Sequence, residues 1–108
     1  MAMEGYESLD EFLQALPALA EPLRDKLRDK DNLFQLECGS RRVFIRLEDG
    51  RVTVSGESED YPVCIVRAEE SLALDLICGR VNPMKALLFG KVSVQGDVKP
   101  LLRLCALL

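Results

Sequence analysis

The sequence predicts an α+β protein in which helices cover one face of a five-stranded, largely antiparallel sheet. Three observations predict this class: a leucine stripe at helical spacing opens the chain, alternating apolar and polar segments follow, and short apolar segments bounded by glycine close it. With 108 residues, 48% hydrophobic and 30% charged, the chain has a globular composition. Its length fits a single domain, residues 1–108.

The N-terminal segment, residues 1–31, is expected to be helical. From residue 9 onward its apolar residues recur every three or four positions, which is typical of a helix with one apolar stripe. Ser8 and Glu11 form a candidate capping box at its start. Pro17 and Pro22 interrupt the pattern, and because an interior proline removes a hydrogen bond, we expect a kinked or broken helix that packs its leucines on a sheet.

Four strands are expected next, within residues 32–67. Residues 32–38 and 41–47 alternate apolar with polar side chains, which predicts half-buried antiparallel strands. Asp49-Gly50 then predicts a tight hairpin turn into a strand at 51–55. The segment 62–68 is almost continuously apolar, so we expect a fourth, better covered strand.

The remaining residues, 68–108, predict the order helix, helix, strand, helix. A first helix begins with the acidic pair Glu69-Glu70, where the helix dipole favours negative charge, and ends at Gly79. Its inner side is expected to hold Leu72 and Leu76, with Ile77 or Cys78.

A second, short helix is expected from Pro83, with Asn82 as its N-cap and Gly90 as its C-cap. The segment 91–95 alternates as a fifth strand, and Gly96-Asp97 turns the chain into a last helix. The short helix and the last helix both carry more apolar residues than one packing stripe needs. These additional apolar residues predict ordinary core, a dimer contact, or the wall of an apolar cavity.

The glycines and lysines of residues 79–97 do not predict a phosphate site. A Walker-type loop needs G-x-x-x-x-G-K-[ST], whereas Gly90-Lys91 is followed by Val92 and Lys85 stands where the first glycine is required. The apolar residues between the glycines also suit a triphosphate poorly. We therefore interpret the glycines as helix and strand ends.

Catalytic and metal chemistry have little support in the composition. The chain has no histidine, which excludes His-based zinc sites and Ser-His-Asp triads within it. Cys38, Cys64, Cys78 and Cys105 each lie in an apolar pattern without a C-x-x-C pair, so we expect reduced, buried thiols. We expect neither an enzyme nor a cofactor.

The net charge of −4 argues against a nucleic-acid partner, which would need a dense basic face. The charge is uneven, because residues 1–60 carry 14 acidic and 8 basic residues and residues 61–108 carry 4 acidic and 6 basic ones. The weakly basic C-terminal part could favour a transient contact with an anionic membrane surface. Without a signal sequence or an apolar span of sufficient length, we expect a cytoplasmic protein.

Two segments resemble the sterol carrier protein type 2 domain family. FIRLEDGRVTVSGES, residues 44–58, is similar to the family's hairpin, and EESLALDLICGRVNPMKALLFGKVSVQGD, residues 69–97, is similar to its helix-glycine-helix-glycine-strand signature. The signature positions are matched by Gly79, Pro83, Met84, Lys85, Ala86, Phe89, Gly90, Lys91, Gly96 and Asp97. The resemblance covers residues 32–108, whereas the N-terminal part matches only as an amphipathic helix.

The resemblance implies an apolar pocket that takes a sterol, a fatty acid or an acyl chain. The candidate lining residues are apolar positions of the predicted strands and helices, namely Phe34, Leu36, Ile45, Val54, Leu76, Met84, Leu87, Leu88, Phe89, Leu101 and Leu104. Each of them could equally be plain core. The sequence thus predicts a non-enzymatic binder or carrier of hydrophobic ligands. Its alternatives are an accessory protein of isoprenoid-quinone or lipid metabolism that acts through a protein partner, and an assembly module that dimerises through the C-terminal helix.

Overall fold

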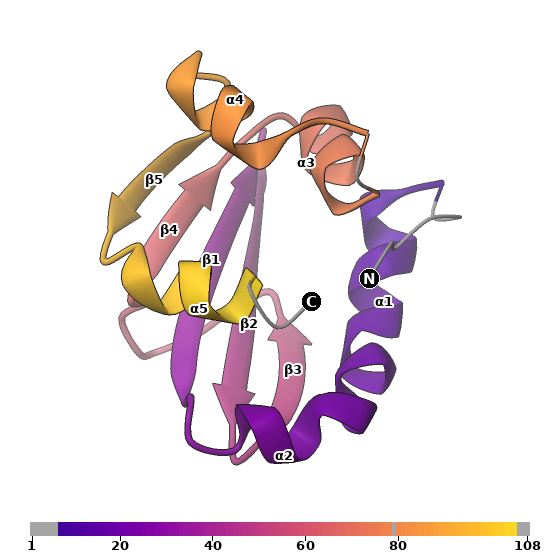
Figure 1. Ribbon diagram of the computed structural model, residues 1–108, viewed down its shortest axis with the longest axis vertical. Coiled ribbons are helices and arrows are strands. Elements are labelled where there is room, and N and C mark those ends of the chain that lie inside the picture. The colour runs from indigo at the N-terminus through magenta and orange to yellow at the C-terminus, as the bar shows by residue number, and fades with distance from the viewer. Residues whose placement is uncertain (1–6, 79, 106–108) are drawn as a thin grey trace.

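The computed structural model describes residues 7–78 and 80–105, without the side chains of residues 77, 83, 84, 87, 104 and 105. Helices begin and end the described part of the chain, four strands follow one another in its middle, and a fifth strand lies between the last two helices (Figure 1). In chain order they are α1 (Leu9–Ala20), the 3-10 helix η1 (Glu21–Leu23), α2 (Arg24–Leu27), β1 (Asn32–Cys38), β2 (Arg41–Glu48), β3 (Arg51–Ser55), β4 (Cys64–Arg67), α3 (Glu70–Ile77), α4 (Pro83–Leu88), β5 (Ser93–Gly96) and α5 (Lys99–Cys105).

The strands form one five-stranded sheet with the order β3-β2-β1-β4-β5. All neighbouring strands are antiparallel except β1 and β4, which run parallel. The expected α+β class and largely antiparallel sheet are therefore confirmed. Because β4 lies between β1 and β5, it is an interior strand, and this position explains its almost continuous apolar sequence.

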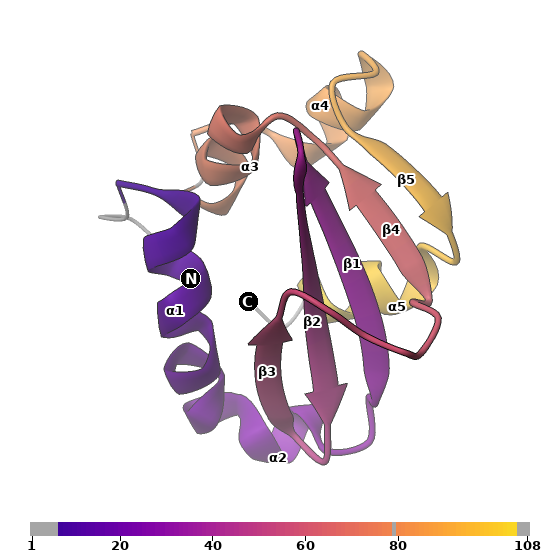
Figure 2. The ribbon, with the colours of Figure 1, turned by 180° about the vertical axis from the view of Figure 1, so that it is seen from behind.

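The helices lie on one face of the sheet, which we call the inner face. In Figure 1, α5 crosses the sheet in front of β1 and β2, and α1 lies beside β3. The opposite, outer face is crossed by residues 56–63, which join β3 to β4 and which we call the crossing segment (Figure 2). One buried cluster joins Leu9, Phe12 and Leu13 of α1 to the sheet, so the leucine stripe packs as predicted.

The N-terminal helix is broken at only one of its two prolines. Pro22 lies in η1, which separates α1 from α2, whereas Pro17 lies within α1 without ending it. The helix continues through Pro17 because Leu16 and Leu19, on either side of it, pack against the sheet. Ser8 is the N-cap, and its Oγ accepts a hydrogen bond from the N–H of Glu11 at 3.1 Å.

The predicted hairpin turn and helix caps have the expected backbone geometry. Asp49 and Gly50 both have positive φ, 50° and 78°, as a two-residue hairpin turn requires. Asn82 Oδ1 accepts from the N–H of Lys85 at 3.3 Å, and Gly90 ends α4 with a φ of 71°. The predicted stop at Gly79 lies outside the described residues.

The buried side of α3 agrees only in part with the prediction. The C-cap Cys78 is buried as expected, at 4% exposed, but within the helix Ala73 is buried, at 5%, while Leu72 and Leu76 are only half-buried. A small residue lets the helix approach its neighbours closely, so the larger leucines lie on either side of the contact. The side chain of Ile77 lies outside the described residues.

Candidate functional site

The inner face of the sheet is apolar along its whole width. Strand register places Phe34 of β1 opposite Ile45 of β2 and opposite Cys64 of β4, so the three side chains share this face. The same alternation adds Leu36, Cys38, Val43, Leu47, Val52, Val54, Val66 and Val94. A continuous hydrophobic surface therefore faces the helices.

Burial of this surface is uneven. Residues toward its ends are closely covered: Cys64 is 1% exposed, Leu47 2% and Cys38 3%. In contrast, Leu36, Ile45, Val54, Val66 and Val94 are only half-buried. Leu36, Ile45 and Val66 belong to interior strands, where closely packed helices would cover them completely. The helices therefore cover these three side chains incompletely.

Two clefts reach this face from different sides. One, of about 520 Å³, lies between α1 and the adjacent ends of β2 and β3, and it reaches Val43 and Val54. The other, of about 260 Å³, lies between the start of β1 and α5, and it reaches Phe34 and Leu47. Both clefts combine these apolar side chains with charged groups at their mouths, such as Arg41 in the first and Arg103 in the second.

Arg41 connects the sheet to two helices at the mouth of the larger cleft. Its guanidinium donates to Asp10 Oδ1 of α1 at 2.5 Å and to Glu70 Oε1 of α3 at 3.0 Å. The hydrogen bond to Asp10, and the charges of both acids, raise the pKa of Arg41 further above its usual value. These ion pairs join α1 and α3 to the edge of the inner face at the mouth of the larger cleft.

Cys38 lies next to this ion-pair group at the end of β1. Burial, and secondarily the negative charge of Glu70, raise the pKa of its thiol above the usual value of 9.0. Cys38, Cys64 and Cys78 are buried and form no disulfide with one another, and the side chain of Cys105 lies outside the described residues. A thiol with this environment is a poor nucleophile.

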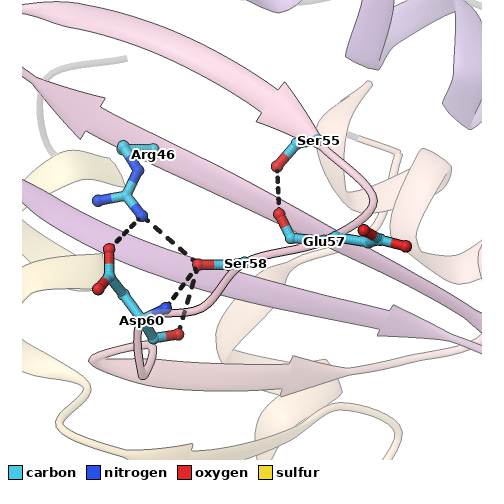
Figure 3. Close-up of polar contacts among 5 residues, drawn as sticks. All are labelled: Arg46, Ser55, Glu57, Ser58 and Asp60. Atoms are coloured by element: carbon cyan, nitrogen blue, oxygen red, sulfur yellow. Dashed lines mark hydrogen bonds and ion pairs between the residues drawn. The ribbon is translucent and has the colours of Figure 1, made fainter.

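The crossing segment covers part of the outer face, where a cleft of about 440 Å³ lies between the segment and Arg42 and Phe44 of β2. Figure 3 shows Arg46 of β2 pointing to Asp60 and Ser58, with Nη2 at 2.7 Å from Asp60 Oδ2 and 3.4 Å from Ser58 Oγ. Beneath this segment Leu33 and Phe44 are 7% and 6% exposed. Most of the half-buried apolar side chains on the interior strands, Leu36, Ile45 and Val66, therefore lie on the inner face.

The structure brings together only part of the predicted lining set. Phe34, Leu36, Ile45 and Val54 share the inner face, while Leu76 and Leu101 are half-buried in α3 and α5. Leu88 and Phe89 are exposed by 78% and 75%, away from this surface. Ala86 of α4 is buried, at 2% exposed. The side chains of Met84, Leu87 and Leu104 lie outside the described residues.

Sequence reasoning missed two half-buried residues of the inner face, Val66 and Val94. They are direct partners on β4 and β5, and Val66 is also the partner of Leu36. The alternation of β5 marked Val94 as inward, but the apolar run of β4 gave no sign of which residues share its face. Only the parallel pairing of β4 with β1 assigns Val66 to the candidate site.

Comparison with known proteins agrees with this geometry. The sequence model of the SCP-2 sterol transfer family matches residues 9–108. The chain belongs to this family. SCP-2 is a lipid-binding fold, and membership supports lipid or sterol binding or transfer in general.

Several solved structures share the fold. The sterol carrier protein domain 2 of Helicoverpa armigera is 21% identical with a TM-score of 0.73, covering 99% of this chain and 91% of its own. A UbiJ-SCP2 ubiquinone synthesis protein is 26% identical with a TM-score of 0.63, covering 92% and 80%. The sec-alkylsulfatase Pisa1 from Pseudomonas sp. is 19% identical with a TM-score of 0.75, but the chain covers 15% of that enzyme's length. No curated protein sequence matches the chain significantly.

Two further observations limit the chemistry within the described ranges. Nowhere in residues 7–78 and 80–105 do three or more His, Cys, Asp or Glu side chains gather as metal ligands would. None of the helices described there has the length and hydrophobicity to cross a bilayer.

Proposed function

We propose that this SCP-2 protein binds, and passes on, a hydrophobic ligand of the size of a fatty acid, an acyl chain or a sterol. The ligand lies between the helices and the inner face of the sheet. One observation carries the proposal: Leu36, Ile45 and Val66 remain half-buried although they stand on interior strands. A ligand with an apolar chain would cover the surface that the helices leave free.

The energetics of such a ligand are sufficient. Burial of each methylene group returns about 0.8 kcal/mol. About ten methylene groups would therefore return roughly 8 kcal/mol before the costs of association, which leaves room for micromolar binding by a longer chain. An apolar wall of this kind discriminates chain length only weakly, so a range of related lipids is expected to bind.

The proposal is tested by the lipids that accompany the protein. Protein purified without detergent is extracted with organic solvent, and the extract is analysed by mass spectrometry. A defined set of lipids at about one molecule per chain supports binding. An extract without lipid, from protein that also fails to take up a fluorescent fatty acid after delipidation, refutes it.

A second candidate is an accessory role in isoprenoid-quinone synthesis. It is favoured by the similarity to the UbiJ-SCP2 ubiquinone synthesis protein, which is 26% identical over 92% of this chain. In this role the inner face would hold an isoprenoid intermediate and a protein partner would act on it. Displacement of the fluorescent fatty acid by a short-chain ubiquinone supports this candidate, and displacement by fatty acids alone argues against it.

Self-association is a third candidate, because α5 exposes 55% of Leu102. A homodimer through this helix would cover the side chain. Light scattering on the purified protein distinguishes the candidates, since a lipid carrier that functions alone is expected as a monomer with bound lipid. An empty dimer would favour the assembly role.

A further inference from the structure

The end of α4 exposes two large apolar side chains side by side. Leu88 and Phe89 are 78% and 75% exposed, although the helix itself is anchored by the buried Ala86. The backbone around them is held in place, because the N–H of Lys91 donates to the carbonyl of Ala86 at 2.9 Å and closes the helix end. Figures 1 and 2 show α4 at one end of the molecule, where its tip projects beyond the sheet.

Two exposed lysines accompany this apolar pair. Lys85 lies one turn before Phe89, whose N–H donates to the Lys85 carbonyl at 3.0 Å, and Lys91 follows two residues after Phe89. Within the described part of the chain neither ammonium group forms an ion pair with a carboxylate. The sequence between Asp75 and Asp97 contains no acidic residue, in a chain whose net charge is −4.

A second exposed aromatic residue provides a contrast. Tyr61 is 96% exposed, but it follows Glu57, Glu59 and Asp60 in the crossing segment. Exposure of an aromatic ring alone therefore does not distinguish the α4 tip. Its distinguishing property is the combination of apolar side chains with cationic side chains that form no ion pair with any described residue. This combination is complementary to a surface with a negatively charged outer layer over an apolar interior.

We propose that Lys85, Leu88, Phe89 and Lys91 dock this protein on anionic lipid membranes. Leu88 and Phe89 would enter the boundary between headgroups and acyl chains, and the two ammonium groups would lie at the level of the lipid phosphates. The inference rests on the proposed function, because a carrier of water-insoluble ligands must reach the membrane that supplies or receives them. The four docking residues do not line the clefts beside α1 and α5, so these clefts are not part of the proposed membrane contact.

Flotation with vesicles tests this docking surface. The wild-type protein is mixed with phosphatidylcholine vesicles that contain or lack phosphatidylglycerol, at low and at high salt. The paired change Leu88→Ser with Phe89→Ser is expected to reduce binding to anionic vesicles at least tenfold. The paired change Lys85→Gln with Lys91→Gln is expected to reduce it by about fivefold for each lysine. Tyr61→Ser, the matched control, is expected to bind like the wild type.

Three outcomes would overturn the docking proposal: equal binding to neutral vesicles, wild-type binding by the Leu88→Ser and Phe89→Ser protein, or loss of a dimer in that variant on sedimentation without vesicles. The last outcome would show that a second copy covers the patch. Uptake of a fluorescent fatty acid by the wild type, measured without vesicles, separates the two proposals. Vesicle binding without uptake refutes the carrier function alone, and uptake without vesicle binding refutes the docking surface alone.

Discussion

Phe34 of β1 and Ile45 of β2 are direct partners on the inner face of the sheet, yet Phe34 is 5% exposed and Ile45 is only half-buried. A completely filled core would cover both, since each stands on an interior strand. Ile45 packs against the two buried clusters, but the helices cover it incompletely. The proposed ligand space begins at this pair.

Enlarging Val66 should therefore be tolerated better than enlarging Val52. Both valines lie on the inner face, but Val66 is half-buried, whereas Val52 is 9% exposed and belongs to a buried cluster with Leu47. Val52→Phe overpacks this cluster and should lower the free energy of unfolding by about 1–3 kcal/mol. Val66→Phe enlarges an incompletely covered side chain and should change it by less than about 1 kcal/mol. Urea denaturation measures both values.

The same two variants should differ in the opposite sense in ligand uptake. Val66→Phe is expected to weaken fluorescent fatty-acid binding, because the ring occupies the ligand's volume. Folded Val52→Phe should retain more of this binding. Equal destabilisation by the two changes would show that the middle of the inner face is as tightly filled as its ends.

Gly50 should be more sensitive to substitution than Gly39, although both have positive φ, 78° and 63°. A Cβ at Gly50 would lie 2.4 Å from the Arg24 carbonyl oxygen, whereas a Cβ at Gly39 would meet no atom within 4 Å. Gly39→Ala should cost about 1 kcal/mol of backbone strain. Gly50→Ala should cost at least about 2 kcal/mol, because α2 must also move away from the hairpin. Similar unfolding free energies would contradict the close approach of α2.

Arg41 should contribute more to stability than Arg28. Arg41 joins Asp10 and Glu70 on two different helices, while Arg28 pairs with Asp25 and, at 3.9 Å, with Asp49, whose side chains are 91% and 70% exposed. Arg41→Gln is expected to lower the free energy of unfolding by about 1 kcal/mol at low salt and by less at high salt. Arg28→Gln is expected to change the free energy of unfolding little at either salt concentration. A larger effect of Arg28→Gln, or no salt dependence for Arg41→Gln, would argue against the proposed connection.

Cys38 should make stability fall at alkaline pH. Its pKa is raised by burial and by Glu70, so above pH 9.0 the unfolded chain releases the thiol proton while the folded chain retains it. Stability from this group is present below pH 9.0 and is lost as pH rises through the folded pKa, with a limiting slope of about 1.4 kcal/mol per pH unit. Urea unfolding from pH 7 to 10 should show a shallower alkaline decline for Cys38→Ala. An unchanged slope would remove Cys38 from this role.

Much of the fold could be predicted because local chemistry determines it. Asp49-Gly50 has few conformations besides a tight turn, and Asn82 and Gly90 limit α4 through hydrogen bonds within a few residues. The parallel pairing of β1 with β4 could not be predicted, because it depends on the route of the crossing segment over the outer face. Pro17, unlike Pro22, does not end the helix, since packing on either side of it keeps α1 intact.

The candidate site was predictable only where alternation is clear. Phe34, Leu36, Ile45 and Val54 follow from period-two patterns and share the inner face. Leu88 and Phe89 belong to a short helix that is apolar on several sides, and its sequence alone does not show which side packs. Ala86 is buried in the structure, and Leu88 and Phe89 lie at the surface.

Native mass spectrometry of the delipidated protein, titrated with a saturated fatty acid of sixteen carbons, tests the proposed lipid space most directly. We expect one fatty acid per chain at micromolar concentrations, and we expect weaker binding by Val66→Phe. Absence of a complex, or equal binding by the wild type and Val66→Phe, would contradict a ligand between the helices and the inner face.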